Sequence, residues 1–245
     1  MKLLDDLIAS LTENAPVRSI LVGTHWVVVC SRFCGMASAM QSEHSHSTPD
    51  VREAGKLHLK SARELAGLVY SDSALEVSVG MAAINSLLEM DESQSVEINA
   101  ADVLADRGRG KNVALIGHFP FITRLRPSLG ELWVIEQRPS EDEYPAEAAS
   151  DLLPRADIVA ITSSAFINHT MEGLLKLCRP EATVMVLGPT TPLSPILFDY
   201  GVDILSGTKV MDEAAVLRTV GQGASFKQVE GVKLLTFVRE KESHP

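Results

Sequence analysis

From residue 112 onward, short apolar runs alternate with segments of helical periodicity. Continuous apolar strands of this kind are buried on both faces, so the alternation predicts a parallel sheet covered by helices on both sides. This is the order of a Rossmann-like, doubly wound α/β unit. The expected strands are 113–117, 131–136, 157–162, 183–188, 202–205 and 232–238, and the expected helices are 120–126, 146–153, 167–178, 193–199 and 211–220, with Gly201 and Gly221 as helix C-caps.

The beginning of the chain has a different order, with strands first and helices after. This order predicts a small α+β domain over residues 1–95, followed by the Rossmann-like domain over 96–245, with a polar linker near 92–111. The expected elements of the first domain are an amphipathic helix over 1–14, strands over 17–23, 24–33 and 35–40, and helices over 57–70 and 73–90.

The overall composition excludes some classes of partner. The formal net charge is −10, with the acidic residues dispersed along the chain. A field of this sign repels nucleic acid and anionic lipid, and no apolar stretch approaches the roughly 20 residues that span a bilayer. Three cysteines (Cys30, Cys34 and Cys178) and the absence of a secretory leader favour a cytoplasmic protein with reduced thiols. A homodimer is the default assembly.

The stretch "GHFPF", residues 117–121, begins like a phosphate-binding turn but lacks the glycines that should follow. Pro120 has no amide proton, so this loop cannot wrap a pyrophosphate in the usual way. His118 instead offers a nitrogen lone pair for metal ligation, proton transfer or a hydrogen bond. The alternative is a histidine that simply packs at the end of a strand.

Glu136 ends the second expected strand, about where a dinucleotide-binding protein places the acid that contacts ribose. Without the glycine fingerprint, nicotinamide and S-adenosylmethionine are less favoured as cofactors than a metal ion.

Two further loops follow strand ends. In "GPTTPLSP", three prolines make a rigid loop, and Thr190 and Thr191 could contact an oxyanion or cap the next helix. In "TSSAF", Thr162 and Ser163 could bind a ligand or only form a helix-entry turn.

Other residues that could hold a metal lie in the first domain. His44 and His46 share a face if the chain is extended there, but a serine-rich loop is more often solvated. Cys30 and Cys34 do not have the spacing of a zinc knuckle, and Cys30 is expected to be a small buried apolar residue.

Several stretches together resemble a prokaryotic family to which heavy-metal chelation is ascribed, whose members join an enolase-N-terminal-like domain to a Rossmann-like domain. They are "GTHWVVV", "SVGMAAINSLL", "GHFPF", "DEYP", "ITSS" and "LGPTTPLSPILFDYG". The resemblance implies a site in a cleft between the two domains. Its candidate residues are His118, Phe119, Pro120, Glu136, Thr162, Ser163, Pro189, Thr190, Thr191, Pro192, Asn85 and His25.

Three functions remain open. The first is binding of a divalent or heavy-metal ion, or of a small metal complex, in this cleft, with His118 and Glu136 as the first candidate ligands. The second is an enzyme that acts on a small anionic or nucleotide-like substrate, with His118 as acid or base. The third is a binding module without catalysis.

Overall fold

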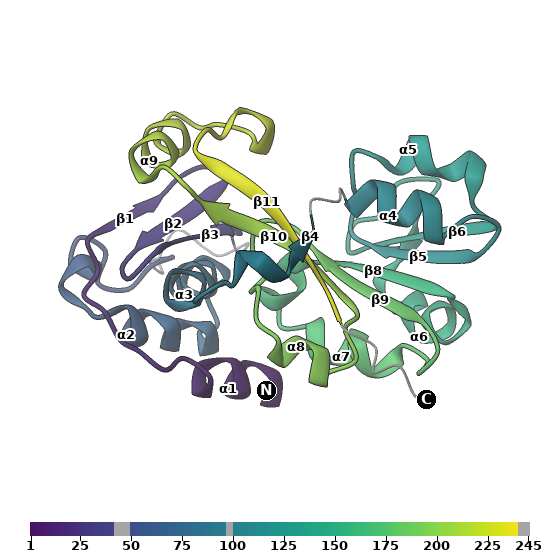
Figure 1. The fold of residues 1–245 in the computed structure, drawn as a ribbon, viewed down its shortest axis with the longest axis horizontal. Helices are drawn as coiled ribbons and strands as arrows, with labels where there is room; N and C mark the ends of the chain where they lie inside the picture. Colours follow the sequence, from purple (N-terminus) through teal and green to yellow (C-terminus); the bar gives the residue numbers. More distant parts are fainter. Residues whose placement is uncertain (42–49, 97–99, 240–245) are drawn as a thin grey trace.

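The computed structural model describes residues 1–41, 50–96 and 100–239, and it has two sheets (Figure 1). His44 and His46 lie outside the described residues. The first part of the chain has the expected order of strands followed by helices. Its elements are α1 (Lys2–Ala9), the antiparallel strands β1 (Ser19–Val22), β2 (Trp26–Cys30) and β3 (Cys34–Ser38), and the helices α2 (Ala62–Ala66) and α3 (Ala74–Leu87).

The small sheet is covered on both faces, which accounts for the continuous apolar sequence of β2. Val27 and Val29 pack in the cluster that contains α3, whereas Val28 and Cys30 pack against α9 (Glu213–Gly221), which comes from the far end of the chain. Gly35 allows α3 to approach β3 closely, because a Cβ there would lie 2.2 Å from the carbonyl oxygen of Ala82. The small sheet is therefore held between α3 and α9 (Figure 1).

The large sheet has the predicted parallel core. β5 (Asn112–Ile116) pairs in parallel with β6 (Glu131–Glu136) on one side and β8 (Ile158–Thr162) on the other. The strand order is β4-β11-β10-β9-β8-β5-β6-β7, so the direction of winding reverses between β5 and β8. The remaining strands are β4 (Ser95–Val96), β7 (Tyr144–Pro145), β9 (Thr183–Leu187), β10 (Ile204–Val210) and β11 (Val232–Val238), of which β11 is antiparallel to both neighbours. Ligands of doubly wound sheets bind at such a reversal point.

Several helices are shorter than their sequence patterns. The expected helix over 57–70 is interrupted by the extended residue Lys60, and the one over 167–178 begins only at Met171, because His169 has a positive φ of 60°. Gly201 turns the chain after α8 with a φ of 86°. The other helices are α4 (Ala100–Arg107), α5 (Ile122–Leu125), α6 (Ala149–Leu152), α7 (Met171–Leu177) and α8 (Ile196–Asp199).

Gly221 is not the C-cap that its position suggested. It is the last residue of α9, and the left-handed turn occurs at Gly223, with a φ of 80°. The helix extends this far because Val220, 1% exposed, packs against the small sheet. The packing of α9 thus overrides the local stop signal.

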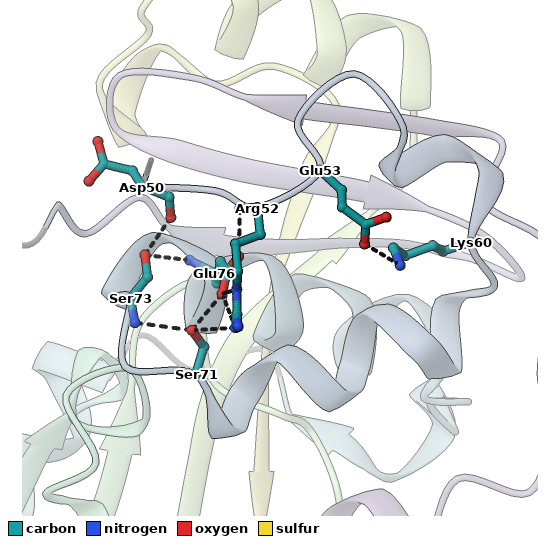
Figure 2. Close-up of polar contacts among 7 residues, drawn as sticks. All are labelled: Asp50, Arg52, Glu53, Lys60, Ser71, Ser73 and Glu76. Carbon is teal, nitrogen blue, oxygen red and sulfur yellow. Dashed lines mark hydrogen bonds and ion pairs between the residues drawn. The ribbon is translucent and has the colours of Figure 1, made fainter. Parts of the chain in front are cut away.

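A buried carboxylate anchors the segment that begins at residue 50 (Figure 2). Glu76 on α3 is only 1% exposed, and it accepts hydrogen bonds from the backbone N–H of Arg52 at 2.6 Å, from the Arg52 guanidinium and from the Ser71 hydroxyl. Burial raises the pKa of Glu76, but the bonds from Arg52 and Ser71 outweigh it and leave the pKa below its usual value.

Candidate functional site

A hollow of about 340 Å³ lies at the carboxyl ends of β5, β6 and β8, where the winding of the large sheet reverses. We call it the strand-end pocket. Met40, just beyond β3 of the small sheet, closes one side, so both parts of the chain contribute to it. It is lined by Met40, Ile116, Gly117, His118, Ile135, Glu136, Gln137, Ala146, Ala149, Thr162, Ser164, Ala165, Asn168, Thr170 and Leu174.

The pocket brings together three of the residues expected at the site. Gly117, with a φ of 105°, leaves β5 so close to β8 that a Cβ would lie 2.9 Å from the Cβ of Thr162. This turn places His118 at the rim, opposite Glu136 and Thr162 on the neighbouring strand ends. A residue other than glycine at 117 would be strained by both its φ and this contact.

The other residues of "GHFPF" do not line the pocket. The Phe119 ring stacks on Phe121, with centroids 5.2 Å apart and planes 7° from parallel, and both rings pack against the apolar cluster around β5. Pro120 is exposed. The aromatic pair therefore anchors the loop and leaves His118 as its open polar side chain.

His118 is paired with a carboxylate. Its Nδ1 lies 2.7 Å from Oε1 of Glu143, whose Oε2 accepts the backbone N–H of Ser140 at 2.9 Å. The Ser140 N–H, and after it the His118 bond, keep the pKa of Glu143 below its usual value. An ionised carboxylate can only accept hydrogen bonds, so Nδ1 of His118 is the donor. Nε2 then carries the free lone pair of the neutral ring.

Among the acidic and basic side chains, the described pocket lining contains Glu136 but no lysine or arginine. Glu136 is half-buried, and one of its oxygens accepts the Gln137 N–H at 3.2 Å. The rest of the polar lining consists of hydroxyl and amide groups, with Thr170 donating to Asn168 at 2.6 Å. No lysine or arginine lines the pocket within the part of the chain that the structure describes. The lining therefore suits a cation or a neutral molecule better than an anion.

Asn85 and Thr190 lie between the two parts of the molecule. The Asn85 amide donates to the carbonyl oxygens of Met36 at 2.9 Å and of Thr190 at 3.1 Å. Thr190 is fully buried, and its hydroxyl accepts the N–H of Ser38 at 2.9 Å. These bonds fix the loop after β9 onto β3. Asn85 and Thr190 do not line the strand-end pocket.

The remaining expected residues also lie away from the pocket lining. Ser163 is 1% exposed and packs against Gly188, where a Cβ would lie 2.5 Å from the Ser163 hydroxyl. His25 is exposed in the turn between β1 and β2. Pro189 is half-buried, and Thr191 and Pro192 are buried in the loop after β9.

Several residues that shape the site were not predicted from the sequence. Glu143 was quoted only within the stretch "DEYP", 25 residues after His118. Met40 comes from the other part of the chain, and Asn168 and Thr170 follow β8 by several residues. The available signal for Glu143 was its place directly before the short strand β7, Tyr144–Pro145.

The cysteines differ from the expectation of reduced thiols. Cys30 is fully buried, as expected, but a disulfide joins it to Cys34. The reason is the hairpin register, which places Cys30 directly opposite Cys34 with their Cα atoms 4.0 Å apart. Cys178 is free, and burial raises the pKa of its thiol to about 11.

The chain is similar in sequence to two family models and to a curated protein. Family models described as "Putative heavy-metal chelation" match residues 4–88 and 99–239. An uncharacterised protein of Methanocaldococcus jannaschii is 27% identical over 160 residues, which are 62% of this chain and 62% of that relative. Among the described residues, no helix has the length and apolar character needed to cross a membrane.

Two solved structures have the same fold over nearly the whole chain. A DUF364-family protein of unknown function from Desulfitobacterium hafniense is 28% identical, with a TM-score of 0.85 over 97% of this chain and 98% of that chain. Another, from Pyrococcus horikoshii, is 21% identical, with a TM-score of 0.83 over the same shares of the two chains. The predicted α/β architecture is confirmed by these structures and by the two sheets described above.

Proposed function

The chain belongs to the DUF364 family, described as "Putative heavy-metal chelation", and from this premise we propose that the strand-end pocket binds a small metal complex. Nε2 of His118 supplies one ligand to the metal, and the chelating molecule that carries the metal supplies the others. Glu136 adds a negative charge to the same pocket.

The pairing of His118 with Glu143 carries the proposal. Histidines that ligate metals donate their second ring N–H to a carboxylate or carbonyl, which fixes the tautomer and makes the free nitrogen a better ligand. The 2.7 Å contact between Nδ1 and Glu143 is this arrangement, in a histidine whose side chain is 64% exposed beside a carboxylate that is 9% exposed.

The size and the donors of the pocket favour a complex over a bare ion. Its volume of about 340 Å³ far exceeds the roughly 30 Å³ that one water molecule occupies in the liquid. His118 and Glu136 also do not belong to a group of three or more metal-binding side chains, within the described ranges of the chain. A chelating molecule can supply the missing ligands and hydrogen-bond to the amide and hydroxyl groups of Asn168, Thr170 and Thr162.

The test uses copper(II) nitrilotriacetate, a chelate that leaves coordination positions open for an imidazole. His44 and His46 are replaced by alanine in every sample, so that this pair of histidines cannot bind the probe. In this background, we expect electron paramagnetic resonance to show coordination by an imidazole nitrogen, in addition to the amine nitrogen of nitrilotriacetate, that is lost in His118→Ala. The matched control is His58→Ala, which removes another exposed histidine.

A decrease in affinity of at least about tenfold, confined to His118→Ala, supports the proposal. Equal affinity of the His118→Ala and His58→Ala proteins would refute it.

The His118–Glu143 pair also favours one other function. A histidine oriented by a carboxylate is also a general base, and Nε2 is the atom that would take the proton. Because the described lining has no cationic side chain, a substrate of such an enzyme is neutral or cationic, in contrast to the anionic substrate considered from the sequence. Turnover of a neutral substrate that His118→Ala abolishes, without any metal present, would favour this second function.

A further inference from the structure

A group of metal-binding side chains lies outside the lining of the strand-end pocket, on the face of the small sheet that α9 covers. One ligand atom from each of Cys30, Cys34 and Glu213 lies within 4.8 Å of the others. Among the described residues, it is the only such group of three or more His, Cys, Asp or Glu side chains. We propose that the reduced Cys30–Cys34 pair, together with Glu213, binds a thiophilic divalent cation of the Zn²⁺ and Cd²⁺ class.

Two elements that are distant in sequence build this group. The β2–β3 hairpin places Cys30 opposite Cys34, so a three-residue turn separates them in sequence while their Cα atoms lie 4.0 Å apart. Glu213 is the first residue of α9, which packs on the same face of the hairpin as Cys30. Spacing along the chain, which argued against a zinc knuckle, does not detect ligands that are brought together across strands.

The donor set and its size fit a thiophilic cation. Two thiolates and one carboxylate are common ligands of zinc, and soft thiolates favour Zn²⁺ over Mg²⁺ or Ca²⁺. In a tetrahedral site with Zn–S bonds of roughly 2.3 Å, neighbouring sulfurs are separated by roughly 3.8 Å. The two sulfurs are bonded in the oxidised chain and must move apart on reduction, whereas a Glu213 oxygen already lies within 4.8 Å of both. The fourth position is left to water or to another ligand.

A cation holds the carboxylate in place. The Arg18 guanidinium donates to Oε2 of Glu213 at 2.7 Å and to the carbonyl oxygen of Ser31 at 2.8 Å. Ser31 is the residue after Cys30, so Arg18 connects Glu213 to the hairpin turn that separates the two cysteines. Arg18 thus holds the Glu213 carboxylate next to the two cysteines, and Glu213 begins α9, where the helix dipole favours negative charge. The Glu213 side chain is 33% exposed, which gives a cation access from solvent.

The disulfide makes binding dependent on redox state. In the oxidised chain the two sulfurs are bonded to each other. A dithiol reductant supplies two electrons and two protons, forms its own disulfide and leaves Cys30 and Cys34 as thiols. Binding of the cation then releases two protons as both thiols become thiolates. Reduction therefore makes the site available, and oxidation closes it.

The experiment titrates Cd²⁺ into the full chain after reduction and removal of the reductant, and follows the ultraviolet charge-transfer absorption of cadmium–thiolate bonds. We expect saturation at about one Cd²⁺ per reduced chain. The oxidised chain should give no signal, and Cys178→Ser should bind as the wild type does. In Glu213→Gln, which keeps both cysteines, we expect affinity at least about tenfold lower.

The double variant Cys30→Ser/Cys34→Ser must lose the signal while circular dichroism shows an intact fold. The inference is overturned if the signal survives in this variant, disappears only in Cys178→Ser, or is unchanged in Glu213→Gln. His118→Ala should leave the Cd²⁺ titration unchanged, so a failure here and a failure at the strand-end pocket can be told apart.

Discussion

Two loops at the same edge of the large sheet have different surroundings. The loop after β5, residues 117–121, and the loop after β9, residues 188–195, both leave the carboxyl end of a parallel strand, and both contain prolines. The first opens on the strand-end pocket through His118. The second is buried against β3, where Thr190 and Asn85 hydrogen-bond across the two parts of the chain. Position at the carboxyl end of a strand thus identifies loops that could bind a ligand. Packing against the small sheet determines which of these loops remain accessible to solvent.

The largest expected effect on folding comes from the buried loop. In Gly188→Ala, the added Cβ would lie 2.5 Å from the Ser163 hydroxyl at a φ of 128°. We expect chemical denaturation to show a loss of about 3 kcal/mol in the free energy of unfolding, since a clash and a strained φ combine. Gly201→Ala, with a φ of 86° and no atom within 4 Å of the added Cβ, is the control and should lose only about 1–2 kcal/mol. Equal losses would show that the close packing of this loop is not significant.

A smaller effect on folding is expected from Thr190→Val, which keeps the shape of the side chain and removes the acceptor for the Ser38 N–H. A buried donor left unpaired costs about 1–2 kcal/mol, measured as the change in the free energy of unfolding. Affinity for copper(II) nitrilotriacetate should not change, because Thr190 lies outside the pocket lining. The control is Thr123→Val, at an exposed position of α5. Loss of probe binding in Thr190→Val would contradict the assignment of the two loops to different roles.

The smallest effect on folding is expected at Glu143→Gln, which removes the carboxylate that pairs with His118 of the open loop. His118 is largely exposed, so the free energy of unfolding should fall only slightly at neutral pH, while affinity for the copper chelate falls about 10- to 100-fold because the ring loses its orienting carboxylate. Calorimetric titration measures this change, with Glu141→Gln, an exposed neighbour, as the control. If both variants bind equally well, Glu143 does not orient His118.

The effect of pH on the stability lost in Glu143→Gln has a defined sign. The pKa of Glu143 is lowered in the folded chain, by the Ser140 N–H first and by His118 second. Its stabilising contribution is therefore fully present above the unfolded-state pKa, near 4.3, and is lost as the pH falls through the lower folded-state value. Denaturation of wild type and Glu143→Gln should differ above pH 4.3 and converge in stronger acid. A difference that grows as the pH falls would contradict this sign.

The sequence was sufficient for the architecture because local composition determines it. Apolar runs such as 113–117 and 183–188 are buried strands wherever helices cover both faces, and the structure contains both as β5 and β9. The expected helix over 57–70 and the stop at Gly221 were wrong in detail. In the second case, burial of Val220 against the small sheet outweighed a local signal.

The strand-end pocket was harder to predict from the sequence, because it depends on contacts between residues that are distant in the chain. Glu136 and Thr162 end the strands on either side of β5, and His118 follows β5, so the expected topology already places them near one another. Glu143 meets His118 only through the path of the chain between β6 and β7, and Met40 only through the docking of the small sheet. The Cys30–Cys34 pair depends on a hairpin register, which spacing along the sequence does not reveal.

The tautomer of His118 tests most directly whether its Nε2 is the metal ligand of the strand-end pocket. Long-range ¹H–¹⁵N correlation spectra of the ring nitrogens at neutral pH identify this tautomer. We predict that Nδ1 carries the proton donated to Glu143 and that Nε2 bears the lone pair. Addition of a diamagnetic zinc chelate with open positions should then shift the Nε2 resonance of His118. A ring protonated at Nε2, or an Nε2 signal that the chelate leaves unchanged, would contradict the claim that this nitrogen is the metal ligand of the pocket.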